Sequence, residues 1–183
     1  DKGLGDLVDA YLLLQEAGRF PDCRLKIAGS CPPGDEDFVN EQKRKIEDAG
    51  LGGLVDWLPN VTREQKVEFL GGLTVFSVPM RYAEAFGLCL IEAMASGVPV
   101  VNPAGSTFEE IAAATGGGRT VTPGDPRALA EGWEELLANP EEAAAMGERG
   151  RRGVENRYSV SVMKDGFLEL AERVCAAAAP REP

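Results

Sequence analysis

The hydrophobic positions along the chain alternate between a helical period and short apolar runs. Residues 4–17 place apolar side chains three or four positions apart and are followed by Gly18, which predicts a helix. Short runs bounded by Gly, Pro or Asn predict buried strands. Strands are expected over residues 23–28, 54–58, 73–79, 98–101 and 119–122, and helices over residues 4–17, 38–49, 62–70, 86–96, 107–114, 126–137, 140–158 and 160–179.

This alternation of strands and helices continues to the end of the chain. It is typical of βαβ units, in which helices cover both faces of a parallel sheet. We therefore expect an α/β fold with a single Rossmann-like, doubly wound parallel sheet of five or six strands. The sequence has no internal repeat and no linker, so one domain is expected over residues 1–175, with residues 176–183 as a tail. Ligands of such sheets bind beyond the carboxyl ends of the strands.

The segment from Glu84 to Glu92 carries two carboxylates eight positions apart, with apolar residues and Gly87 between them. From Gly87 to Val101, Glu92 is the only charged residue. A helix that is apolar on all sides is normally buried, and a buried carboxylate is costly unless another group binds it. No Lys or Arg lies within one helical turn of Glu92, so its partner has to come from elsewhere.

The spacing of these groups suits a ligand with both phosphate and hydroxyl groups. If the helix begins near Phe86, Glu84 lies in the preceding loop and Glu92 one to two turns inside. The backbone N–H groups of Phe86, Gly87 and Leu88 would then form an anion site at the helix N-terminus. In the alternative interpretation, the helix dipole stabilises Glu84 and Glu92 pairs with an Arg from a distant helix. The residues alone leave both interpretations open.

Composition narrows the classes of function. The formal net charge is −11, which argues against general binding to nucleic acid or to anionic membranes. The chain has no His, which excludes Ser-His and Cys-His nucleophiles, and its four Cys form no CxxC pair, so no metal site is expected. Free thiols predict a reducing compartment. With no signal peptide and no run long enough to span a bilayer, we expect a cytoplasmic protein.

The stretch Glu84-Ala-Phe-Gly-Leu-Cys-Leu-Ile-Glu92-Ala-Met-Ala-Ser-Gly-Val-Pro-Val-Val101 resembles the Glu-x7-Glu signature of the family 4 glycosyltransferases, which have the GT-B fold. Further motifs of that family follow in the family's order, and the resemblance covers essentially the whole chain. Pro59 and Ser106 stand where the family frequently has Gly, and the Arg of its Gly-Arg-Leu motif is absent. The matching segments are residues 1–4, 25–29, 55–61, 105–111 and 121–129.

The resemblance implies a retaining, metal-independent transferase that uses a nucleotide-activated sugar and no cofactor. Two residues match its catalytic positions: Glu84 would hold hydroxyls of the donor sugar, and Lys2 would neutralise the diphosphate leaving group. An exposed terminal cation is the alternative for Lys2. Glu92 would accept hydrogen bonds from the ribose hydroxyls. The remaining donor contacts implied are Phe86, Gly87 and Leu88 for the sugar and diphosphate, Asn60 and Val61 for the base, and Gly29 and Ser30 for the ribose.

A GT-B enzyme has two Rossmann-like domains, and the resemblance concerns only the C-terminal, donor-binding one. The chain begins without Met in a helical pattern, so we expect a fragment that lacks the N-terminal domain and its sugar or lipid-linked acceptor site. Through that domain the protein could lie on the cytoplasmic membrane face. The fragment is expected to bind nucleotide weakly without turnover. Two alternatives stay open: a non-catalytic nucleotide- or sugar-phosphate-binding module, and a GT-B sugar-nucleotide epimerase, which would be expected to carry a His.

Overall fold

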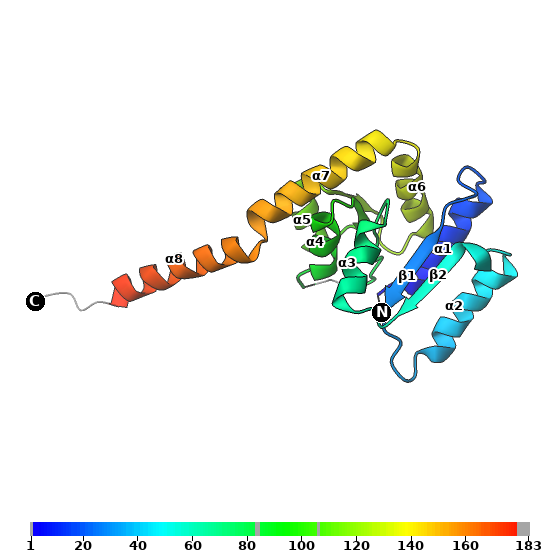
Figure 1. The fold of residues 1–183 in the computed structure, drawn as a ribbon, viewed down its shortest axis with the longest axis horizontal. Helices are drawn as coiled ribbons and strands as arrows, with labels where there is room; N and C mark the ends of the chain where they lie inside the picture. The colour runs from blue at the N-terminus through cyan, green and yellow to red at the C-terminus, as the bar shows by residue number, and fades with distance from the viewer. Residues whose placement is uncertain (1, 83–84, 106, 179–183) are drawn as a thin grey trace, which may run out of the picture.

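The computed structural model describes residues 2–82, 85–105 and 107–178, and helices and strands alternate along it (Figure 1). The helices begin and end close to the predicted positions. They are α1 (Leu4–Glu16), α2 (Glu36–Asp48), the short 3₁₀ helix η1 (Gly52–Leu54), α3 (Arg63–Gly71), α4 (Leu88–Ala95), α5 (Thr107–Thr115), α6 (Pro126–Leu137), α7 (Pro140–Arg157) and α8 (Val160–Ala178). The strands are β1 (Leu25–Gly29), β2 (Val55–Pro59), β3 (Val100–Pro103) and β4 (Gly118–Val121).

The strands are parallel, as predicted, but within the described ranges they form two separate pairs. β1 pairs with β2, and β3 pairs with β4. The predicted strand over residues 73–79 contributes a single parallel bridge, between Phe76 and Val100. The predicted α/β class with parallel strands is confirmed, while the ladders among the described residues comprise four strands and one bridge instead of five or six strands in one continuous sheet.

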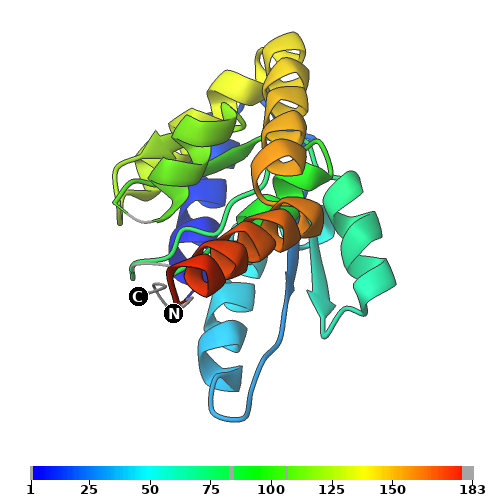
Figure 2. The ribbon, with the colours of Figure 1, turned by 90° about the vertical axis from the view of Figure 1, so that its left-hand side faces the viewer.

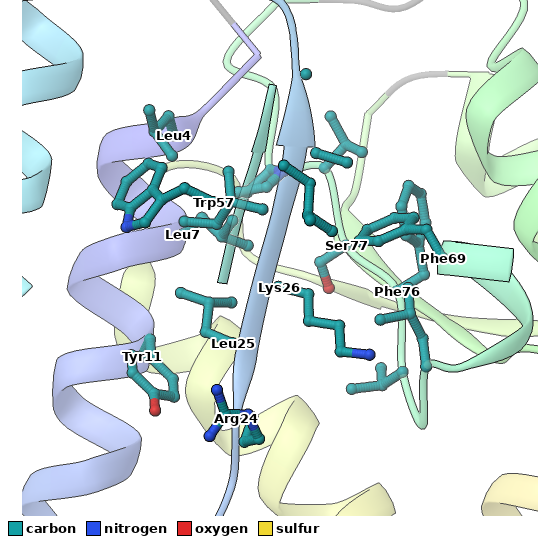
Figure 3. A pocket seen from close by; sticks show the side chains of 18 of the residues that line it. Leu4, Leu7, Tyr11, Arg24, Leu25, Lys26, Trp57, Phe69, Phe76 and Ser77 are labelled. Carbon is teal, nitrogen blue, oxygen red and sulfur yellow. The ribbon is translucent and has the colours of Figure 1, made fainter. Parts of the chain in front are cut away.

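Side chains explain why the strand over residues 73–79 is short. The Ser77 hydroxyl donates to the carbonyl of Val101 (2.6 Å) and accepts from the indole N–H of Trp133 (2.8 Å). The backbone N–H of Val78 donates to Oδ1 of Asn102 (2.7 Å), a side chain that is 2% exposed. Polar side chains thus bind this segment where ladder hydrogen bonds would otherwise continue. The edge of the segment that faces β1 borders a cavity (Figure 3).

The buried side chains form two clusters. One joins α1, α6 and the first strand pair, with Tyr11, Leu14 and Trp133 among its members. The other surrounds α4 and includes Leu90 and Phe108. These clusters fix α1 and α4, the two helices whose N-termini lie near the candidate site described below.

Helix α8 extends away from the rest of the fold, as two perpendicular views show (Figures 1 and 2). Most of its large apolar side chains are more than half exposed. Within the described ranges, none of the helices combines the length and the apolar character needed to cross a bilayer.

Candidate functional site

Helix α4 begins at Leu88, two residues later than the sequence predicted. Gly87 is its N-cap, in the left-handed conformation with φ 77°, which glycine adopts without steric cost. The carbonyl of Gly87 accepts from the backbone N–H groups of Leu90 (3.0 Å) and Ile91 (3.2 Å). Phe86 therefore lies before the helix, and the first N–H groups of α4 have no intrahelical acceptor.

Glu92 lies in the second turn of α4 and its side chain is 39% exposed. The prediction that the Glu92 carboxylate is buried is therefore wrong. The buried residues of α4 lie on the opposite side of the helix from Glu92. Its partner is Lys66 of α3, whose Nζ lies 2.5 Å from Glu92 Oε1. The cation from a distant helix is present, but it is a Lys and not the Arg that the alternative interpretation expected.

The position of Lys66 follows from the start of α3. Thr62 and Gln65 form a capping box: the Thr62 N–H donates to Gln65 Oε1 (2.8 Å), and the Gln65 N–H donates to Thr62 Oγ1 (3.3 Å). Such reciprocal bonds satisfy two N–H groups and define where a helix begins. Lys66 is the fourth residue of that helix, and its N–H donates to the Thr62 carbonyl (2.9 Å).

The loops after β1 and β2 meet at the predicted base and ribose positions. The N–H of Asn60 donates to the carbonyl of Gly29 (3.0 Å). Asn60 has φ 54° and is the only non-glycine residue with positive φ in the described part of the chain. Backbone in such sparsely populated regions is concentrated at functional sites. Sequence reasoning identified this residue by resemblance, but not its conformation.

A cavity of about 1340 Å³ runs between β1 and residues 72–79 and connects these loops with α4. Figure 3 shows Lys26 extending from β1 toward Phe76 across this space. The predicted site residues that line the cavity come from four segments: Lys2, Gly29, Ser30, Val61 and Glu92.

The N-terminus of α1 is packed against the loop that follows residues 73–79. Gly3 caps α1 with φ 80°, and a Cβ at this position would lie 2.0 Å from the carbonyl oxygen of Pro79. Only glycine permits this approach. The ammonium group of Lys2 lies 3.4 Å from the sulfur of Met80. Lys2 therefore reaches the cavity that also contains Glu92.

An ion pair that the sequence did not predict fastens the same loop. Arg81 donates from Nε to Asp6 Oδ2 (2.9 Å) and from a terminal nitrogen to Asp6 Oδ1 (2.5 Å). The Asp6 side chain is only 5% exposed. These hydrogen bonds raise the pKa of Arg81 above its usual value. An Asp in the first turn of a helix is common, so nothing in the sequence pattern indicated this pair.

Glu84, the proposed catalytic carboxylate, lies outside the described residues, as does Ser106. In the described part of the chain, no three His, Cys, Asp or Glu side chains are arranged to hold a metal ion, and no disulfide joins the cysteines. The polar groups that line the cavity suit a ligand with hydroxyl and anionic groups.

The family model described as glycosyl transferases group 1 matches residues 1–153. The chain belongs to this family. The phosphatidyl-myo-inositol mannosyltransferase of Mycolicibacterium smegmatis is 30% identical over 176 residues, which are 96% of this chain and 43% of the relative. A GDP-mannose-dependent mannosyltransferase of Corynebacterium glutamicum is 30% identical, over 93% of this chain and 44% of its own length. The glycosyltransferase chain described here thus spans less than half of these curated relatives.

Solved structures of this family's fold agree with the architecture. Sucrose-phosphate synthase from Thermosynechococcus elongatus superposes with a TM-score of 0.80 at 27% identity, over 97% of this chain and 43% of that one. HepE from Anabaena, solved in complex with UDP, gives a TM-score of 0.83 at 22% identity, over 94% and 45%. These superpositions confirm that this glycosyltransferase chain has the α/β fold of one part of larger proteins.

Proposed function

We propose that this chain is the donor-binding domain of a retaining, metal-independent glycosyltransferase that transfers a glycosyl group from a nucleotide sugar. The observation that carries the proposal is the convergence of Lys2, Gly29, Ser30, Val61 and Glu92 on one cavity. Three of them lie at the carboxyl ends of the parallel strands β1 and β2, where α/β folds bind ligands: Gly29 is the last residue of β1, and Ser30 and Val61 lie in the loops that follow the two strands.

The proposed donor contacts have separate chemical tasks, whether they line the cavity or lie beside it. Glu92 accepts hydrogen bonds from the ribose hydroxyls, and the base lies against Asn60 and Val61. Lys2 and the backbone N–H groups at the start of α4 stabilise the diphosphate, since helix N-termini favour anions. Together they stabilise the charge that develops on the leaving group, which is the role a metal ion has in other transferases. Glu84 is proposed to hold hydroxyls of the donor sugar.

The identity of the donor is a separate question from its class. Two relatives are named as mannosyltransferases, one of them GDP-mannose-dependent, whereas the Anabaena structure contains UDP. We therefore propose a nucleotide hexose as donor and a binding panel to identify its base and sugar.

We further propose that the complete protein has a second, acceptor-binding domain that covers α8. The apolar residues of α8 recur at alternating spacings of three and four, as in a helix that packs along one seam. They are between 56% and 77% exposed: Val160, Met163, Phe167, Leu170 and Val174. The relatives carry more than half of their length outside the matched region and are similar over most of this chain, which supports a partner for this seam in the longer protein. A cytoplasmic location is proposed because the cysteines of the described residues form no disulfide, as is usual in a reducing compartment.

A donor panel tests the proposal. UDP-, GDP- and ADP-sugars are titrated into the chain and into the full-length protein while thermal unfolding is followed. A true donor at a hundredfold excess over its dissociation constant stabilises by about 2.7 kcal/mol. Glu92→Gln is expected to weaken binding by about tenfold or more, since it removes a charged acceptor. Glu131→Gln, an exposed residue of α6, is the matched control.

Two results would contradict the proposal. One is that no sugar nucleotide stabilises the protein, and the other is that Glu92→Gln binds the preferred donor as well as the unchanged chain does. Full-length protein that binds a donor but never consumes it with any acceptor would instead be a binding module. Glycosyl transfer by the 183-residue chain alone would contradict its expected dependence on a second domain.

A further inference from the structure

We propose that Lys66 is a positioning residue for the ribose site: it holds the Glu92 carboxylate in place and neutralises it. This inference rests on the proposed function and extends it to a residue outside the Glu-x7-Glu segment. Lys66 and Glu92 both line the cavity that also contains Ser30 and Val61. The pair therefore lines the same cavity as proposed base and ribose contacts and does not lie on a remote surface.

The geometry of the pair leaves room for a ligand. Lys66 Nζ approaches Glu92 Oε1 at 2.5 Å. A carboxylate has two oxygens with about four acceptor sites in all. One cation on Oε1 therefore fixes the rotation of the carboxylate and leaves Oε2 available for ribose hydroxyls. The two side chains are 41% and 39% exposed, so a ligand can reach both.

Charge gives a second reason for a cation at this point. A nucleoside diphosphate is an anion, and the chain itself has a net charge of −11. An uncompensated Glu92 would repel the phosphates of the ligand that its hydroxyl contacts are meant to bind. Lys66 removes this repulsion while the carboxylate still accepts hydrogen bonds. Two unit charges that lie a few ångströms apart interact substantially even when solvent partly screens them.

If Lys66 had only a structural role, its removal would affect unfolding and ligand binding differently. Half-exposed ion pairs contribute little to stability, typically 0 to ~1 kcal/mol. Helix α3 also has its own capping box, which defines its start without Lys66. A Lys66 that merely tethered α3 to α4 would thus affect unfolding slightly, and it would not distinguish ligands with ribose hydroxyls from ligands without them.

The test compares UDP and GDP with their 2′,3′-dideoxy counterparts by isothermal titration calorimetry on this chain. Variants are Lys66→Met, Lys66→Arg, Glu92→Gln and the double variant Lys66→Met/Glu92→Gln. Lys164→Met is the matched control, because Lys164 also pairs with a carboxylate but lies on α8. Circular dichroism establishes that each variant is folded.

Lys66→Met is expected to weaken binding of the preferred diphosphate by roughly tenfold, the scale of a charge-assisted hydrogen bond. Binding of the dideoxy counterpart should weaken by clearly less, because that ligand loses only the charge compensation and has no ribose hydroxyls to be positioned. Lys66→Arg should restore most of the affinity, and the double variant should resemble Glu92→Gln alone. Unchanged diphosphate binding by Lys66→Met, or an equal loss for both ligands, would overturn the inference while the proposed function stands. If the unchanged chain and the full-length protein bind no nucleotide, the proposed function fails, and the inference fails with it.

Discussion

Leu90 gives a direct test of how firmly α4 is held. Its side chain is fully buried in the cluster with Leu70, Met94, Phe108 and Ile111. Burial of a Leu contributes about 1.5–3 kcal/mol, and the cavity that truncation leaves adds to the loss. Leu90→Ala is therefore expected to destabilise the fold by about 2.7–5 kcal/mol, the range of buried Leu-to-Ala changes.

Chemical and thermal unfolding followed by circular dichroism measure this loss. For a chain of this length, each kcal/mol lowers Tm by about 2–4 °C, so a decrease of roughly 5–20 °C is expected. Leu88→Ala makes the same chemical change two residues earlier, where the side chain is 63% exposed, and should remain within about 0.5 kcal/mol. Equal stability of the two variants would refute the assignment of Leu90 to the core face of α4.

Two further predictions concern stability and pH. Arg81→Met should lower Tm more than Asp6→Asn does. The first change leaves a carboxylate that is 5% exposed without its cation, whereas the second leaves a solvated guanidinium. Thermal unfolding of both variants measures the two Tm values, and the reverse order would contradict the burial of Asp6. Burial raises the pKa of Tyr11 from 10.0 to about 12, while its hydroxyl donates to the Cys23 carbonyl (2.8 Å). The unfolded chain loses this proton first, so the contribution to stability is complete below pH 10 and lost as pH rises toward 12. Denaturant unfolding at several pH values should show this decrease in the unchanged chain and not in Tyr11→Phe.

Local features of the fold could be predicted from the sequence. The helix expected from residue 62 and the alternation of helices with parallel strands depend on neighbouring residues, and both are confirmed. The start of α4 was predicted two residues too early, because an apolar run does not reveal that Gly87 adopts a left-handed conformation.

Long-range features could not be predicted in the same way. Asp6 and Arg81 are 75 positions apart, and Lys66 and Glu92 are 26 apart, so no helical or strand period relates them. The predicted strand over residues 73–79 is reduced to a single bridge for a similar reason. Asn102 binds the N–H of Val78 from a different strand, and only the folded chain brings these groups together.

The hydrogen bond between Asn60 and Gly29 has a consequence for how donor preference changes among related chains. Because the loops after β1 and β2 are joined at this point, the surfaces proposed for the base and for the ribose form one mechanical unit. A substitution that reshapes one of them displaces the other. We therefore expect a change of nucleotide preference in this domain to involve substitutions at both places, because a backbone shift at one is transmitted to the other.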